Sequence, residues 1–328
     1  MRIALIGGAG FIGHHLALRL ADLGHSVVIY DFMAVNNKFA PQVRNNPEYV
    51  AMIEERLSML KGIPLWTNDA RDYHMLSNVL GDFRPDAIVH LAAIAHIDRA
   101  NKDPYSTFDH MQRTLENALD VAHSIKCPHF VFFSSSTAYG DFQKPVVDEN
   151  ESCRPKGIYG HLKLGGEGMV RAYGDLGLPW SIVRPCALYG PRCVSGRVTQ
   201  KFVEMAHAGK TIRIDGDGEG RHDFTCIHDL VDGVTRLLAK GPTGHVFNIT
   251  AGEARSVNEL GAVVRRAYPD LRVEHGPADP QKPSRGTMSV KKAHESLGYA
   301  PQWPLERGMT DYIAWYRLFR ASLERKAA

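Results

Sequence analysis

The sequence contains few cysteines, and no pattern pairs them. Five occur in 328 residues and none forms a C-x-x-C pair; they are Cys127, Cys153, Cys186, Cys193 and Cys226. An odd number without paired spacing favours neither a disulfide framework nor a zinc ribbon. We therefore expect a protein of the reducing cytoplasm.

Long apolar runs are also missing. No segment approaches the ~18 consecutive apolar residues that a membrane span requires. The first strand-like run reaches glycine at Gly7, which is too early for the apolar core of a signal peptide. These absences predict a soluble, cytoplasmic protein without a membrane partner.

Charge of neither sign dominates. The chain has 39 Lys and Arg against 36 Asp and Glu, a net charge of +3. This balance argues against a nucleic-acid partner but leaves room for a local anion site. The 16 histidines show neither H-x-x-x-H nor H-E-x-x-H spacing, so we expect no metal site.

The composition is that of an ordinary globular protein. Hydrophobic residues make up 44% of the chain and charged residues 23%, which excludes disorder, collagen and coiled coil as descriptions of the whole. At about 100–200 residues per domain, the length suits two domains.

Short apolar runs alternate with helical patterns over the first 250 residues. The predicted strands are 3–6, 26–30, 87–91, 130–133, 181–183 and 246–249, and the most evident helices are 105–124 and 159–176. Strands that alternate with helices indicate a parallel sheet with helices on both faces. The predicted fold class is α/β, a Rossmann-type doubly wound sheet. Beyond residue 250, a capping box at Ser256 and Glu259 starts one helix, and another covers about 305–323.

A glycine-rich stretch lies between the first predicted strand and the first helix. Gly7, Gly10 and Gly13 permit a tight turn, close approach of a pyrophosphate and close helix–strand packing. Asp31 ends the next strand, where a carboxylate can accept both hydroxyls of an adenosine ribose and repel a 2′-phosphate. The pattern predicts a dinucleotide site that favours NAD over NADP.

A second group combines a phenol, an amine and a hydroxyl. Tyr159 and Lys163 are four residues apart on a predicted helix and share one face. An ammonium beside a phenol lowers the pKa of the tyrosine, which suits a general base. Ser135 follows a buried strand, at the sheet edge where ligands bind.

Together these motifs resemble the extended short-chain dehydrogenase/reductase family, in its nucleotide-sugar epimerase/dehydratase branch, over essentially the whole chain. The resemblance implies that Ser135, Tyr159 and Lys163 are catalytic. It implies NAD contacts from Gly7, Gly10, Phe11, Ile12, Gly13, Asp31, Asp69, Ala70, Leu91, Ala92, Ala93, Tyr159 and Lys163. The segments 184–191 and 216–229 match the family patterns RPxNVYGP and GDGxxxRDFxxVxD.

The departures from the family concern the substrate side. Ala187 replaces the usual Asn of RPxN, and His222 replaces the usual Arg before Asp-Phe, with Arg221 one residue earlier. Arg285 lies where the family often places a second phosphate-binding arginine. Either the diphosphate is held differently, by Arg285 and Arg221, or the substrate is unusual. For His222, domain packing and substrate contact both remain open.

The resemblance implies a transient keto-sugar formed by reversible hydride transfer to NAD. Dehydratases of the family follow the catalytic hydroxyl residue with Asp-Glu, whereas here Ser136 and Thr137 follow Ser135. Epimerisation, at carbon 4, therefore fits best. The alternatives are a nucleotide-sugar 4,6-dehydratase, a keto-sugar reductase and a non-catalytic dinucleotide-binding protein.

The resemblance also implies the domain division and the assembly. The NAD-binding domain is expected at 1–190 and 224–251, and a smaller, discontinuous C-terminal domain for a nucleotide-diphosphate sugar at 191–223 and 252–328. Family members pair the helices that correspond to 105–124 and 170–178, so we expect a homodimer.

Overall fold

The computed structural model describes residues 1–40, 43–94, 97–277 and 284–327. In chain order its helices and helical turns are α1 (Phe11–Asp22), α2 (Pro47–Met59), α3 (Tyr73–Phe83), α4 (Ile97–Lys102), α5 (Pro104–Phe108), the π-helical turn η1 (Asp109–Arg113), α6 (Thr114–Ser124), the 3₁₀ turn η2 (Ser136–Tyr139), α7 (Gly157–Asp175), α8 (Val198–His207), α9 (Ile227–Lys240), α10 (Val257–Ala267), α11 (Lys291–Leu297) and α12 (Leu305–Ala327).

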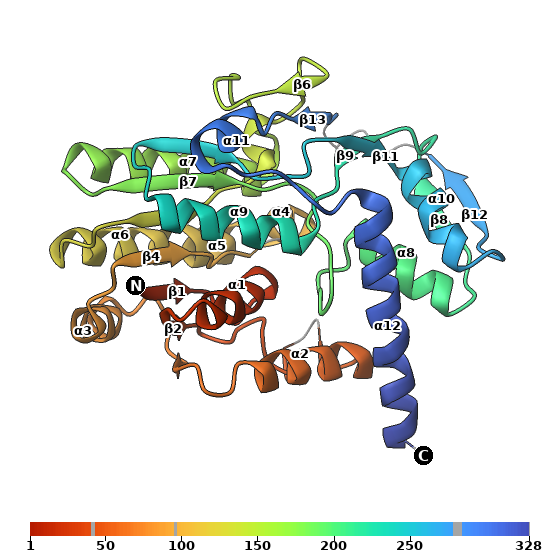
Figure 1. Cartoon of the computed structure of the whole chain (residues 1–328), viewed down its shortest axis with the longest axis horizontal. Helices are drawn as coiled ribbons and strands as arrows, with labels where there is room; N and C mark the ends of the chain where they lie inside the picture. The colour runs from red at the N-terminus through yellow and green to blue at the C-terminus, as the bar shows by residue number, and fades with distance from the viewer. Residues whose placement is uncertain (41–42, 95–96, 278–283, 328) are drawn as a thin grey trace.

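A parallel sheet forms the centre of the molecule (Figure 1). Its order is β10 (His245–Asn248), β7 (Trp180–Arg184), β5 (Phe130–Phe133), β4 (Ala87–His90), β1 (Arg2–Ile6), β2 (Ser26–Tyr30) and β3 (Leu65–Trp66). Every pairing in it is parallel. The predicted α/β, doubly wound fold is confirmed, and the strand order reverses beside β1, where such sheets bind ligands.

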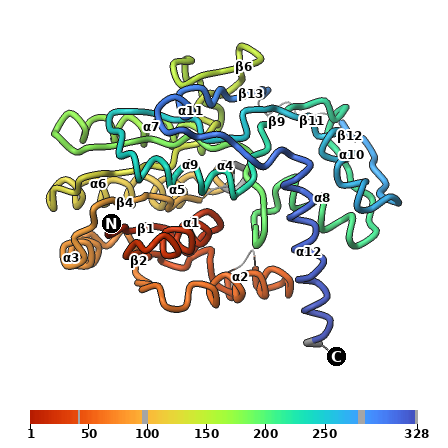
Figure 2. Tube along the Cα trace, in the orientation of Figure 1, coloured from red at the N-terminus to blue at the C-terminus, as the bar shows by residue number. Residues whose placement is uncertain are grey.

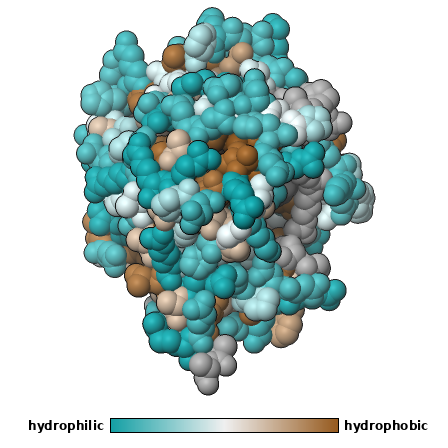
Figure 3. All heavy atoms as spheres, turned by 90° about the vertical axis from the view of Figure 1, so that its right-hand side faces the viewer, coloured by the Kyte–Doolittle hydropathy of each residue, from teal (hydrophilic) through white to brown (hydrophobic). Residues whose placement is uncertain are grey.

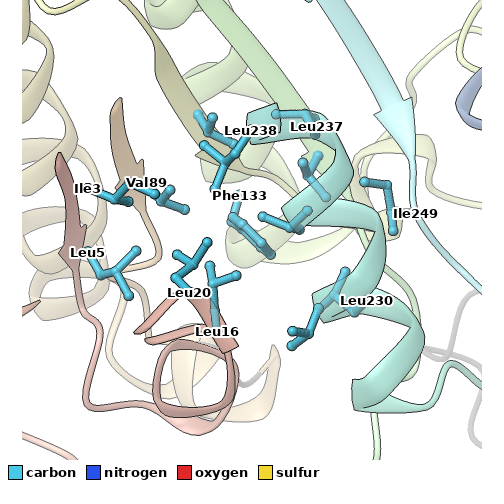
Figure 4. Close-up of a cluster of buried hydrophobic side chains, with 14 of the residues drawn as sticks. Ile3, Leu5, Leu16, Leu20, Val89, Phe133, Leu230, Leu237, Leu238 and Ile249 are labelled. Carbon is cyan, nitrogen blue, oxygen red and sulfur yellow. The ribbon is translucent and has the colours of Figure 1, made fainter. Parts of the chain in front are cut away.

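Two hydrophobic layers cover the sheet. Because successive side chains of a strand point to opposite faces, Ile3 and Leu5 join one layer while Ala4 and Ile6 join the other. Helices α1, α9 and α11 cover the first face, and α3, α6 and α7 the second. In Figure 4, Leu16 and Leu20 of α1 point toward the strands, and Leu230, Leu237 and Leu238 of the neighbouring α9 belong to the same layer.

The remaining elements gather beyond one end of the sheet. They are α8, α10, α12 and three short strand pairs: β8 (Ile212–Asp215) with β12 (Val273–Gly276), β9 (Arg221–Asp223) with β11 (Ala254–Ser256), and β6 (Val146–Val147) with β13 (Thr287–Met288). In Figures 1 and 2 the pair β6–β13 lies at the top of the molecule, and the other elements of this group lie toward the right. Figure 3 shows this side covered mostly by hydrophilic residues, with hydrophobic residues near its centre. The residue-by-residue domain division stays a prediction.

Helix α2 links the sheet to these outer helices. It follows β2, but the Tyr316 hydroxyl of α12 donates to Glu48 at 2.7 Å, and the Tyr49 hydroxyl donates to Glu204 of α8 at 3.1 Å. Met52 is fully buried in the same core as Tyr316. Glu48 also forms an ion pair with Arg320.

The predicted strands and helices are present with one exception, and β3 and the short strands outside the main sheet have no counterpart among the predictions. The capping box is present, with the Ser256 hydroxyl accepting from the Glu259 N–H at 3.1 Å. The helix predicted at 105–124 is divided into α5, η1 and α6, because the chain forms a π-helical turn at Asp109–Arg113. The two-residue edge strand β3 is too short for a hydrophobic pattern to predict.

Candidate active site

The glycine-rich turn joins β1 to α1 as predicted. Gly7 has φ +79°, and a Cβ there would lie 2.6 Å from the backbone N of Ala92. A Cβ on Gly13 would lie 2.5 Å from the Cα of Gly8. Both positions therefore require glycine, because the turn packs directly against the backbone that follows β4 and against Gly8.

The start of α1 presents free backbone donors. Gly10 is its N-cap and supplies no side-chain cap, and its first turn contains no acidic residue. The first N–H groups of a helix lack partners within the helix, and their dipoles favour an anion. Phe11 and Ile12 thus lie where a pyrophosphate would bind.

Asp31 lies just beyond β2, beside this turn, and is buried. Its carboxylate accepts the N–H of Ala9 at 3.0 Å, the N–H of Met33 at 2.8 Å and the amide of Asn36 at 3.1 Å. Burial raises the pKa of Asp31, and these donors oppose the rise. The carboxylate has about four lone-pair positions, so it can still accept from a ribose hydroxyl.

Of the predicted adenine contact, Asp69 lines an open cavity of about 400 Å³ together with Arg71 and Asp109, whereas Ala70 is buried beside it and does not line it. Both carboxylate oxygens of Asp69 accept from Arg71, which also forms an ion pair with Asp109 of η1. Burial raises the pKa of Asp69, but the bonds from Arg71 outweigh it and hold this pKa below its ordinary value. The guanidinium lies 5.8 Å from the ring centroid of the exposed Phe32.

The residues beyond β4 connect the cofactor side to the catalytic side. Leu91 packs against the α1 layer, Ala92 against the opposite layer and Ala93 against the cluster that contains Tyr159. The structure therefore places these three predicted contacts between the glycine-rich turn and the catalytic helix.

Ser135, Tyr159 and Lys163 come from two neighbouring elements. Ser135 follows β5 in an extended conformation, and its Oγ accepts the N–H of Thr137 at 3.2 Å. Tyr159 and Lys163 lie on α7 and are both buried. The Lys163 Nζ donates to the carbonyl of Phe133 at 2.6 Å and lies 5.9 Å from the centroid of the Tyr159 ring.

The electrostatics of the phenol differ from the prediction. Burial raises the pKa of Tyr159, and the charge of Arg197, a hydrogen bond with Ser135 and the charge of Arg285 lower it in part. The predicted lowering by Lys163 does not hold for the protein alone. Burial instead lowers the pKa of Lys163 to about 7, with Glu167 opposing this fall.

A buried ion pair anchors α7 to the sheet. Glu167 accepts Nε of Arg184 at 2.8 Å and its Nη2 at 2.7 Å, and it also accepts the hydroxyl of Ser134 at 2.6 Å. Glu167 is one helical turn beyond Lys163, so these bonds fix the catalytic helix against β5 and β7.

On the substrate side, the structure places only one of the two predicted arginines beside the catalytic group. Arg285 Nη1 donates to the Ser136 hydroxyl at 2.9 Å. Arg221 is exposed on β9, where it lies 3.7 Å from Glu259 and donates to the carbonyl of Ala254. His222 is half-buried, with its ring 5.5 Å from that of Phe224.

Ala187 is half-buried and has φ +37°. A residue other than glycine is strained in this region, and asparagine tolerates it better than alanine does. The asparagine that the family usually has at this position would therefore suit the backbone here. Alanine keeps the turn but provides no polar contact.

Sequence reasoning missed Arg197. It is the N-cap of α8, half-buried, and its charge acts on Tyr159 and Cys193. Over the described ranges, no side chain forms an ion pair or hydrogen bond with it. No motif marks it, because its place beside Tyr159 depends on how α8 packs.

Two negative findings apply to the described part of the chain. No group of three or more His, Cys, Asp and Glu residues there could hold a metal ion. None of the helices there is long and apolar enough to cross a membrane.

Comparisons with known proteins show the family of the chain. Residues 3–250 match the family model described as "NAD dependent epimerase/dehydratase family". YtcB of Bacillus subtilis, named an uncharacterized UDP-glucose epimerase, is 31% identical over 96% of this chain and 98% of its own. A probable UDP-glucuronate 4-epimerase of Rhizobium meliloti is 28% identical over 96% and 97%.

Solved structures give the same result. The UDP-glucose 4-epimerase of Thermotoga maritima, crystallised with UDP-glucose, superimposes with a TM-score of 0.86 at 25% identity, over 97% of this chain and 99% of that chain. The dTDP-glucose 4,6-dehydratase DesIV of Streptomyces venezuelae gives 0.83 at 25%, over 98% of both chains. The chain belongs to the NAD dependent epimerase/dehydratase family.

Proposed function

We propose that this protein is an NAD-dependent nucleotide-sugar epimerase that acts at carbon 4 of the sugar. NAD is the cofactor, and the residues around the glycine-rich turn suit it. Gly7 and Gly13 make the close backbone contacts that such a turn requires, and Asp31 provides a carboxylate for the ribose. When bound, NAD supplies a reversible two-electron oxidation of a hydroxyl-bearing carbon.

One observation carries the choice of epimerisation. The two residues after Ser135 are hydroxyl residues, and Ser136 is occupied by Arg285. The Thr137 hydroxyl is buried, and no partner for it occurs among the described residues. Neither hydroxyl is an acid or base near neutral pH. Dehydration requires a group that removes a proton from carbon and a group that assists the loss of water. Neither Ser136 nor Thr137 can therefore serve in these roles.

The residues can perform proton transfer at one oxygen. Ser135 orients the reacting hydroxyl, and Tyr159 takes its proton and later returns it. The charges of Arg197 and Arg285 favour the phenolate form of Tyr159 that this step requires. Lys163, whose pKa of about 7 lets it hold or release a proton, lies beneath the Tyr159 ring.

The same two arginines support a diphosphate-bearing substrate. Arg285 and Arg197 are half-buried cations near the reacting end of the site, and guanidinium groups bind phosphate oxygens well. Arg221, by contrast, is already paired with Glu259. We therefore assign the diphosphate to Arg285 and Arg197 instead of Arg285 and Arg221. The relatives named for UDP-sugars suggest the first nucleotides to test.

The test is incubation of the protein and NAD with UDP-glucose, UDP-glucuronate and dTDP-glucose, followed by NMR of the sugars. A change of configuration at carbon 4 without accumulation of NADH supports the proposal. Net NADH, or a 4-keto-6-deoxy product, would instead assign a dehydrogenase or a dehydratase.

Tyr159→Phe should lower turnover by about 10²–10⁴-fold, because general acid–base catalysis is lost. Tyr173→Phe is the matched control, since Tyr173 lies on the same helix but bonds to Asp120 at 3.5 Å, away from Ser135. Full turnover by Tyr159→Phe would contradict the mechanism.

A further inference from the structure

Two consecutive histidines of α1 contact the chain segment that precedes α8. His14 is fully buried; its Nδ1 lies 3.0 Å from the carbonyl of Gly10, and its Nε2 lies 3.0 Å from Nε of Arg192. His15 Nε2 lies 3.1 Å from the carbonyl of Pro191. The cofactor-binding helix and the 191–197 segment are thus joined at two points.

The chemistry of the partners fixes the proton on His14. A guanidinium only donates hydrogen bonds, so Nε2 must accept from Arg192. The ring proton is then on Nδ1 and is donated to the Gly10 carbonyl. Burial, followed by the charges of His15, Arg56 and Arg192, holds the pKa of His14 well below its ordinary value, so the ring remains neutral.

The Gly10 carbonyl belongs to the peptide group that contains the N–H of Phe11. Because this group is planar and trans, the direction of the carbonyl fixes the opposite direction of the N–H. That N–H is the first unpaired donor of α1, in the position that binds a pyrophosphate. The His14 ring and the His14 backbone N–H, which donates to the same carbonyl at 3.0 Å, therefore together hold this peptide with the Phe11 N–H directed at the cofactor.

Arg192 is itself held from two directions. Its Nη1 pairs with Glu55 at 3.1 Å, and its carbonyl accepts Nη2 of Arg56 at 2.6 Å. Arg56 Nη1 also donates to Asn36 at 3.1 Å, and Asn36 donates to Asp31 at 3.1 Å. Arg192 has φ +62°, a strained conformation that persists only where surrounding contacts hold it. One network thus contacts both the glycine-rich turn and the ribose carboxylate.

We propose that His14 and Arg192 are positioning residues for NAD: their hydrogen bond fixes the glycine-rich turn against the 191–197 segment and slows release of the dinucleotide. Neither residue takes part in the chemistry on the sugar. The inference goes beyond the proposed function, because it depends on NAD as the cofactor and on no particular substrate.

The experiment measures NAD dissociation from the purified holoenzyme. NAD that leaves the protein is trapped by an excess of a scavenging dehydrogenase with its alcohol, and the NADH formed is followed by absorbance. No nucleotide-sugar is present, so failure of this proposal and failure of the epimerase assignment are distinguishable.

Three single variants and one double variant test the bond. Arg192→Gln and His14→Gln should each release NAD about tenfold faster, because a charge-assisted hydrogen bond is lost. Arg192→Lys keeps the charge but lacks the planar fork, so it should behave like Arg192→Gln. The double variant, His14→Gln with Arg192→Gln, should be no faster than about tenfold, because both changes remove one interaction.

A matched control separates positioning from general loss of stability. His129 is also buried, and its Nε2 lies 2.9 Å from the Ser181 hydroxyl, far from the turn. His129→Gln should leave the dissociation rate within about twofold of wild type. The proposal is overturned if either Gln single variant stays within twofold of wild type, if Arg192→Lys retains NAD like wild type, if His129→Gln matches the increase, or if the effects of the two single changes multiply.

Discussion

Replacing Asp223 by asparagine should change how the stability of this protein depends on pH. Asp223 ends β9 and is fully buried. Its Oδ2 accepts the hydroxyl of Thr250 at 3.0 Å and the N–H of Met288 at 3.1 Å. Burial raises the pKa of this carboxyl to about 7, and the hydrogen bonds oppose only part of that rise.

The sign follows from proton binding. In the unfolded chain the carboxyl ionises near its ordinary pKa of 3.8, whereas in the folded protein it keeps its proton to about pH 7. Between these values the folded state binds more protons, so the free energy of unfolding falls as the pH rises. At about 1.36 kcal/mol per pKa unit, the loss is about 4 kcal/mol, of which about 3 kcal/mol falls between about pH 5 and pH 8.

Asparagine cannot ionise, but its oxygen can accept the same two hydrogen bonds. The experiment compares urea unfolding of Asp223→Asn with that of wild type in identical buffers. The contributions of all other titrating groups cancel, because both proteins share them. The stability of the variant relative to wild type should increase by about 3 kcal/mol from about pH 5 to about pH 8. A relative stability that is equal at both pH values would refute the reasoning, because the buried carboxyl would then ionise as it does in the unfolded chain.

Three further predictions concern other parts of the chain. Ala187→Gly should raise the free energy of unfolding by about 1 kcal/mol, because glycine adopts positive φ without strain; urea unfolding measures this, and a loss of stability would contradict it. Glu167→Gln should lower that free energy by about 3–5 kcal/mol, because Arg184 keeps a buried, unpaired charge; a cost below about 1 kcal/mol would contradict it. Changing both Tyr105 and Phe108, exposed aromatic residues of α5, to serine should convert the predicted homodimer to a monomer in sedimentation experiments, whereas an unchanged mass would rule out this face as the interface.

The sheet could be predicted from the sequence because its strands are short apolar runs bounded by polar or glycine residues. The runs at 26–30 and 130–133 coincide with β2 and β5. The π-helical turn at Asp109–Arg113 could not be predicted, because it keeps the apolar pattern of an ordinary helix. Only the tertiary contacts of η1, such as the ion pair of Asp109 with Arg71, distinguish it.

The residues of the candidate site also fall into two groups, those that the sequence could place and those that it could not. Gly7, Tyr159 and Lys163 belong to local motifs, whose geometry is fixed by a few neighbouring residues. Arg197 and Arg221 depend on which distant element they meet. Arg221 lies in the segment that the sequence predicts for the substrate side. However, its strand, β9, pairs with β11, and its side chain contacts Ala254 and Glu259.

The contacts of helix α2 oppose movement of α8 and α12 away from the sheet. A swing of α8 and α12 away from the sheet would break the bonds of Tyr316 to Glu48 and of Tyr49 to Glu204, and would expose the fully buried Met52. Each of these losses costs free energy. If the proposed epimerase reaction takes place, the walls of the site would therefore keep their distance while the oxidised sugar turns over.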